Sequence, residues 1–146
     1  MRARELAALR QAWGWCGVDF AEIVAHSLFG HVLAIDTAGN YHYLDPELLC
    51  LTALGDEKAA SAHMAQAQTK AIWRADAHVA KADKALGATT LGEVYGFTPA
   101  ALIAGDYDAA NMIRVELALY IRLTGDIAQQ VQDLPEGAHV EIKVSD

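Results

Sequence analysis

The segment Leu91–Asn111 restricts the possible folds of this chain more than any other stretch. It reads Leu-Gly-Glu-Val-Tyr-Gly-Phe-Thr-Pro-Ala-Ala-Leu-Ile-Ala-Gly-Asp-Tyr-Asp-Ala-Ala-Asn and holds three glycines and one proline. The Glu-Val-Tyr unit between Gly92 and Gly96 is typical of a short strand. Pro99 cannot donate a ladder hydrogen bond, so this strand stops at Phe97 or lies at a sheet edge. We therefore expect a strand, an irregular crossing and a Gly-Asp turn here, followed by a helix.

Apolar periodicity predicts further helices and strands on both sides of this segment. Residues spaced by three and four indicate helices, and alternating residues indicate strands. The expected helices span residues 4–13, 19–27, 56–86 with a break near Thr69, and 111 or 115 to 132; the expected strands span residues 31–35, 41–44, 48–54, 92–96 and 139–144. The length of 146 residues suits one domain with its own core. The sequence thus predicts an α+β fold: a single domain, residues 1–146, whose mixed or antiparallel sheet has a hairpin near the N-terminal third and packs against several helices.

Three pieces of the sequence resemble one known family. They are the hairpin Leu28-Phe-Gly-His-Val-Leu-Ala-Ile-Asp-Thr-Ala-Gly-Asn-Tyr-His-Tyr-Leu-Asp-Pro46, the motif Gly92-Glu-Val-Tyr-Gly-Phe-Thr-Pro99 and the closing helix from about Val115 to Val131. Together they are similar to the C-terminal domain of immunity proteins that protect bacteria from DNase effectors of the type VI secretion system. Members of that family often have Leu-Gly-Gly where this chain has Leu102-Ile-Ala-Gly-Asp106, and often carry a further N-terminal domain.

This resemblance implies a binding protein rather than an enzyme. A protein of this kind would bind a cognate toxic effector, here a secreted nuclease, and occlude its active site. The residues themselves agree, because the chain contains no Gly-x-Ser-x-Gly elbow, no phosphate-binding glycine loop and no cysteine beside a base. We therefore expect no catalytic residues and no cofactor.

The charge of the chain favours a basic protein partner. The net charge is −8, and no Lys or Arg occurs between Arg10 and Lys58, although seven acids do. A negative surface repels phosphate backbones, which argues against direct nucleic-acid binding, and it attracts basic proteins such as nucleases. The alternative interpretation is that the acidic balance serves solubility alone.

Acidic turns that contain or adjoin tyrosines are the candidate partner-binding sites. Carboxylates on rigid turns can accept paired hydrogen bonds from Arg, and tyrosines are common at the centres of interfaces. The candidate residues are Asp36, Tyr41, Tyr43, Asp45, Glu47, Asp106, Tyr107 and Asp108. We expect the acid pairs Asp45/Glu47 and Asp106/Asp108 to be exposed and ionised. The alternative is that the tyrosines pack on the sheet and the acids are only solvated.

Six histidines raise the alternative of a small-ligand or metal site. His31 and His42 fall on the two expected hairpin strands and would lie across from each other, with Asp45 as a third polar group. A zinc site needs three or four converging ligands, usually including a pair close in sequence. The chain has no His-x-x-x-His or Cys-x-x-Cys pair. The spacing therefore predicts no metal site, and His63 and His78 are expected to be solvated on helices.

The remaining expectations concern cysteines and location. Cys16 and Cys50 are far apart among apolar neighbours, so we expect both to be reduced and buried. From the first residues we expect no N-terminal leader, and the sequence contains no apolar run long enough for a bilayer. It thus predicts a cytoplasmic protein that does not bind membranes.

Overall fold

The computed structural model describes residues 2–97 and 109–132. Its helices are α1 (Ala3–Trp13), α2 (Glu57–Ala65), α3 (Ala67–Arg74), α4 (Asp76–Leu86) and α6 (Leu117–Val131), with the 3₁₀ turns η1 (Gly14–Cys16) and η2 (Ala109–Asn111). Its strands are β1 (Phe20–His26), β2 (Val32–Asp36), β3 (Tyr41–Asp45), β4 (Cys50–Gly55), β5 (Glu93–Phe97) and β6 (Met112–Glu116). The α+β class is confirmed, and both sheets are antiparallel. The strand predicted at residues 139–144 lies outside the described residues.

Four strands form one sheet in the order β1-β2-β3-β4. In the β2–β3 hairpin, Ala34 lies opposite His42. The hairpin turn is closed by Asp36, whose Oδ1 accepts hydrogen bonds from the backbone N–H groups of Ala38 at 2.8 Å and Asn40 at 3.0 Å. This local capping explains why the chain reverses here. The predicted hairpin and the predicted third strand of the meander are both confirmed.

Strand β1 replaces the helix predicted for residues 19–27, and that prediction is wrong. The β1–β2 pairing has irregularities between Phe20 and Glu22 and between Ile23 and Ala25. An extra residue at a bulge shifts which face the next side chain points to. Phe20 and Ile23 are therefore both buried, although they are three residues apart in a strand. Apolar residues three apart also indicate a helix, so the bulged strand has the residue spacing that the sequence analysis interpreted as helical.

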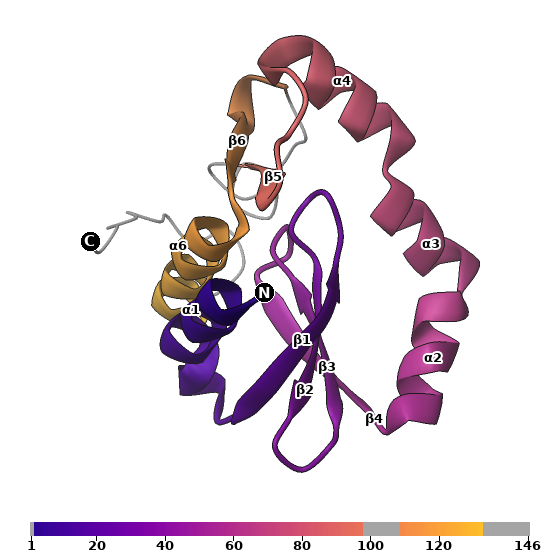
Figure 1. Cartoon of the computed structure of the whole chain (residues 1–146), viewed down its shortest axis with the longest axis vertical. Helices are drawn as coiled ribbons and strands as arrows, with labels where there is room; N and C mark the ends of the chain where they lie inside the picture. The colour runs from indigo at the N-terminus through magenta and orange to yellow at the C-terminus, as the bar shows by residue number, and fades with distance from the viewer. Residues whose placement is uncertain (1, 98–108, 133–146) are drawn as a thin grey trace.

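Helices α1 and α6 lie side by side and cover one face of this sheet (Figure 1). The indole Nε1 of buried Trp13 donates a hydrogen bond to the Ile121 carbonyl oxygen at 3.2 Å. The two helices approach closely because Gly125 has no side chain: a Cβ there would lie 2.6 Å from the Ala12 carbonyl oxygen. The main hydrophobic core lies between these helices and the sheet. Among the described residues, no helix combines the length and the apolar character that a bilayer crossing needs.

Helices α2, α3 and α4 form a helical arm that runs from the end of β4 to β5 (Figure 1). A single break near Thr69 was predicted for this stretch, whereas the helices are interrupted at Gln66 and at Ala75. The arm is attached to the face of the sheet opposite α1 and α6. There Nε1 of Trp73 on α3 donates a hydrogen bond to Tyr43 Oη on β3 at 2.9 Å.

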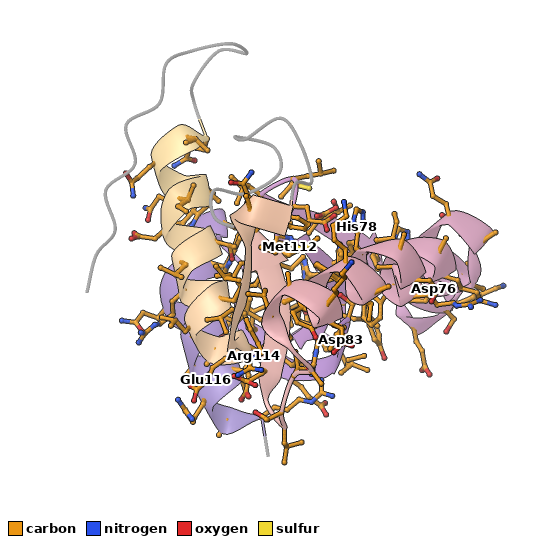
Figure 2. The ribbon with its side chains drawn as sticks, turned by 90° about the horizontal axis from the view of Figure 1, so that it is seen from above. Asp76, His78, Asp83, Met112, Arg114 and Glu116 are labelled. Carbon is orange, nitrogen blue, oxygen red and sulfur yellow. The ribbon has the colours of Figure 1, made fainter. Side chains whose placement is uncertain are left out.

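The second sheet pairs β5 with β6 and contains the Gly-Glu-Val-Tyr-Gly-Phe motif. Residues 112–116 were predicted as the start of the last helix, but they form β6, and α6 begins at Leu117. Helix α4 packs on this sheet through a second core cluster, which consists of Phe29, Ala82, Tyr95, Phe97 and Met112. Figure 2 shows Arg114 of β6 close to α4, and its Nη1 donates hydrogen bonds to the carbonyl oxygens of Leu86 and Ala88.

Candidate functional site

The hairpin residues predicted to bind a partner lie at two opposite ends of the four-stranded sheet. We name one the turn end, which comprises Asp19, Asp36, Asp56 and Glu57. We name the other the histidine end, which comprises His31, Asp45 and Glu47. In Figure 1 the β2–β3 turn and the β4–α2 junction, which belong to the turn end, are at the bottom. The other three predicted residues, Asp106, Tyr107 and Asp108, lie outside the described residues.

Exposed carboxylates gather at the turn end from separate stretches of the sequence. Asp19 precedes β1, and its backbone carbonyl accepts a hydrogen bond from the Thr37 N–H at 2.9 Å. The β3–β4 register brings Asp56 and Glu57 to the same edge as Tyr41. Asp19, Asp56 and Glu57 are all exposed. The sequence analysis did not select these three acids, because only the strand register shows that they share one end of the sheet.

Asp36 is more enclosed than its position beside a turn would suggest. Its Oδ1 closes the turn, and its Oδ2 lies 2.8 Å from His42 Nε2. Only 16% of its side chain is exposed. The hydrogen bond from His42 holds the pKa of Asp36 below its ordinary value, with help from the turn backbone. Asp36 therefore stabilises the hairpin while adding negative charge to the turn end.

The two hairpin tyrosines have different surroundings. Tyr41 is half-buried next to the turn end. Tyr43 is only 8% exposed, and its ring lies 5.0 Å from that of His63 on the helical arm. Burial raises the pKa of Tyr43 to about 12, although the hydrogen bond from Trp73 opposes this. Tyr43 thus joins the arm to the sheet, as the packing alternative expected.

His31, Asp45 and Glu47 converge at the histidine end. The Nε2 atom of His31 lies 3.8 Å from Asp45 Oδ1 and 3.7 Å from Glu47 Oε2. Only 15% of the Asp45 side chain and 13% of the Glu47 side chain are exposed. The prediction that this acid pair sits in an exposed turn is therefore wrong. The turn folds inward because Asp45 Oδ1 accepts hydrogen bonds from the backbone N–H groups of Glu47 and Leu48.

The strand register also corrects the expected pairing of two histidines. His42 lies opposite Ala34, and its ring nitrogen meets Asp36. His31 lies just before β2, one step beyond the last hairpin pair, which places it opposite Asp45. Successive residues of a strand point to opposite faces, so His31 and His42 face opposite sides of the sheet. Of the three residues in the ligand-site alternative, His31 and Asp45 come together and His42 does not.

Tyr120 on α6 connects the Gly-Glu-Val-Tyr-Gly-Phe motif to the β1–β2 turn. Its Oη accepts a hydrogen bond from the Phe97 N–H at 3.1 Å. A Cβ at Gly96 would lie 2.5 Å from Tyr120 Cζ, and a Cβ at Gly30 would lie 2.7 Å from its Cδ2. Both glycines therefore make room for the Tyr120 ring. Burial raises the pKa of Tyr120 well above its ordinary value.

Several smaller expectations are also corrected. Cys16 and Cys50 are free but exposed, so the prediction that they are buried is wrong. His63 and His78 are half-buried instead of solvated. Their rings contact aromatic rings, and that of His78 lies 5.9 Å from the ring of Phe29.

Comparison with known proteins gives no assignment for this site. No protein family matches the sequence, and no curated protein matches it. The function of the chain is therefore inferred from its residues, from their geometry and from the motif resemblance.

Proposed function

We propose that this protein is an immunity protein that binds a basic nuclease effector through its acidic turn end and occludes the effector's active site. The observation that carries the proposal is that three exposed acids, Asp19, Asp56 and Glu57, lie at the same end of the sheet as Asp36. All four come from the stretch between Arg10 and Lys58, which contains no Lys or Arg. The resemblance of the Gly-Glu-Val-Tyr-Gly-Phe motif to an immunity-protein family supports the same kind of partner.

The chemistry of the turn end suits a nuclease cleft. Nucleases bind phosphate groups with cationic side chains, and carboxylates can accept the same charge-assisted hydrogen bonds from Arg. Two of the four acids are already held in place, because Asp36 closes the turn and Asp56 Oδ1 accepts a hydrogen bond from the Ala59 N–H at 2.9 Å. Side chains that are ordered before binding lose less conformational entropy when they bind.

The Asp106-Tyr107-Asp108 turn is included in the proposed surface on sequence grounds. If Arg or Lys of the effector pairs fully with these acids, Asp106→Lys/Asp108→Lys should weaken binding by at least about 2 kcal/mol. Equal affinity of this variant and the wild type would remove the turn from the interface.

The proposed role needs no catalytic residue, no cofactor and no contact with nucleic acid. It places the protein in the cytoplasm of the cell that makes the effector, where the nuclease would otherwise cleave the cell's own DNA. The long-range attraction between the acidic turn end and a basic cleft would speed association.

Co-expression with the nuclease effector encoded beside the gene tests the proposal. We expect growth to be restored, the purified proteins to form a stable complex, and DNA cleavage in vitro to stop when the two are mixed. A catalytically inactive effector is the control that separates binding from protection of DNA. Failure to bind and to neutralise every neighbouring effector would overturn the proposed function.

A further inference from the structure

The His31 side chain at the histidine end is buried in an unusual state. Only 1% of it is exposed, and its Nε2 has no hydrogen-bond partner among the described residues. Leaving a buried polar atom unpaired costs about 1–3 kcal/mol, and folded proteins rarely do so. Nε2 lies between two carboxylates, at a point where a bound cation would supply the missing partner.

The distances around His31 fit a shared cation better than direct hydrogen bonds. At 3.7 and 3.8 Å, the carboxylate oxygens are beyond the usual hydrogen-bond range of about 2.7–3.2 Å. By contrast, His42 Nε2 lies 2.8 Å from its Asp36 partner. Two ligands bonded to one tetrahedral Zn²⁺ at about 2.0–2.1 Å lie roughly 3.3–3.4 Å apart. A contraction of a few tenths of an ångström would bring each carboxylate oxygen to that distance from Nε2, and the ligand atoms of all three side chains already lie within 4.8 Å of one another.

The His31 ring is held in the orientation that a metal ligand needs. Its Nδ1 lies 2.6 Å from Ser27 Oγ, which also accepts the backbone N–H groups of His31 at 3.0 Å and Phe29 at 3.3 Å. With an ion on Nε2, the ring would carry its hydrogen on Nδ1 and donate it to this oxygen, as histidines that bind metals usually do with a neighbouring acceptor. The ring centroid also lies 6.1 Å from that of Tyr43 and 6.4 Å from that of Trp73. Nε2 is thus aimed between Asp45 and Glu47 by its surroundings.

In the described part of the chain, no Arg or Lys side chain forms an ion pair with Asp45 or Glu47. The Arg side chains instead pair with Glu116, Asp76 and Glu93. Two half-enclosed carboxylates with no cation would repel each other. A divalent ion would neutralise both, and the partial exposure of the two acids leaves it a way in.

We propose that His31, Asp45 and Glu47 bind one divalent transition-metal ion, with water completing its coordination. One imidazole nitrogen and two carboxylate oxygens are a donor set suited to Zn²⁺ or Mn²⁺. In residues 2–97 and 109–132, this is the one group of at least three such side chains that converges, with its ligand atoms within 4.8 Å of one another. The ion would join the β1–β2 turn to the β3–β4 turn. The site is separate from the turn end and does not depend on the proposed function.

Titration of Zn²⁺ alone into the EDTA-treated full chain near neutral pH tests the site. We expect one ion bound per chain by calorimetry and by metal analysis, and a higher melting temperature when the ion is present. The affinity should fall as the pH is lowered, because the imidazole must lose its proton to bind. Absence of binding at micromolar Zn²⁺, or of any thermal shift, would overturn the proposal.

Glu47→Gln is the decisive variant. It removes one ligand charge but preserves the Asp45 turn, which uses the Glu47 backbone N–H and not its side chain. We expect at least about a tenfold loss of Zn²⁺ affinity. Glu57→Gln makes the same chemical change at an exposed acid of the turn end and should bind Zn²⁺ like the wild type. If Glu47→Gln also binds like the wild type, the ion lies elsewhere and the assignment is wrong.

Discussion

Replacing Gly96 with Ala should destabilise the protein by about 2 kcal/mol. The new Cβ would lie 2.5 Å from Tyr120 Cζ and 3.0 Å from Tyr120 Cδ1, well inside the usual contact distance. The ring cannot easily move away, because Tyr120 is 2% exposed and its Oη accepts a hydrogen bond from the Phe97 N–H. Overpacking of a core costs about 1–3 kcal/mol. The restriction of the unfolded chain by Ala offsets about 0.4–1 kcal/mol of this cost.

Thermal and urea denaturation followed by circular dichroism measure this loss. A change of about 2 kcal/mol corresponds to a fall of about 4–8 °C in Tm for a chain of this size. Gly14→Ala is the matched control, because Gly14 has a φ of −63° and no atom within 4 Å of the position of a new Cβ. That variant should be as stable as the wild type or slightly more stable.

Equal stability of Gly96→Ala and the wild type would refute the close contact between this glycine and the Tyr120 ring. A double-mutant cycle with Tyr120→Leu isolates the contact, since removing the ring should remove most of the cost of Ala at position 96. If that cost is the same with and without the ring, the glycine is required for another reason.

Three further predictions concern ionisation and hydrogen bonding. Burial raises the pKa of Tyr43 from 10.0 to about 12, so its contribution to stability is present below pH 10.0 and is lost as the pH rises through about 12. The free energy of unfolding of Tyr43→Phe, measured by urea denaturation, should therefore fall less steeply in alkali than that of the wild type. The His42 hydrogen bond lowers the pKa of Asp36 from 3.8, so its contribution to stability is present above pH 3.8 and is lost as the pH falls through the lowered value. The free energy of unfolding of Asp36→Asn should therefore fall less steeply in acid than that of the wild type. Trp73→Phe should lose about 0.5–1.5 kcal/mol with its hydrogen bond to Tyr43, measured by urea denaturation. Trp15→Phe, whose indole N–H has no partner among the described residues, should lose less.

The sequence predicts those elements of the fold whose apolar periodicity is undisturbed. Helix α1, the hairpin, β4 and β5 all follow from residue spacing and turn chemistry. Strand β1 does not, because its bulges place Phe20 and Ile23 on one face at a helical spacing. Strand β6 was missed because it continues into α6 with no intervening turn, and Glu116 at the helix start makes no side-chain capping hydrogen bond.

The candidate sites depend on strand register, which composition does not contain. The acidic character of the region was visible in the sequence, but Asp19 and Asp56 lie at the same end of the sheet only because β1 to β4 pair in order. The arrangement of the histidine end could have been predicted from the sequence. Counting outward from the hairpin turn places His31 opposite Asp45, and the Asp-Pro-Glu sequence brings Glu47 back toward the same point. The burial of these groups depends on the helical arm and α6, and no local pattern predicts it.

Measurement of the association rate constant with the neighbouring nuclease effector tests the central claim most directly. Raising the salt concentration should slow association of the wild type markedly and change its dissociation rate less. Asp19→Lys/Glu57→Lys at the turn end should slow association by at least about tenfold at low salt. The control Asp76→Lys/Asp83→Lys, on exposed positions of α4 labelled in Figure 2, makes the same charge change away from the turn end and should associate nearly as fast as the wild type. Equal association rates for the two double variants would contradict the account, because the turn end would then have no special part in binding.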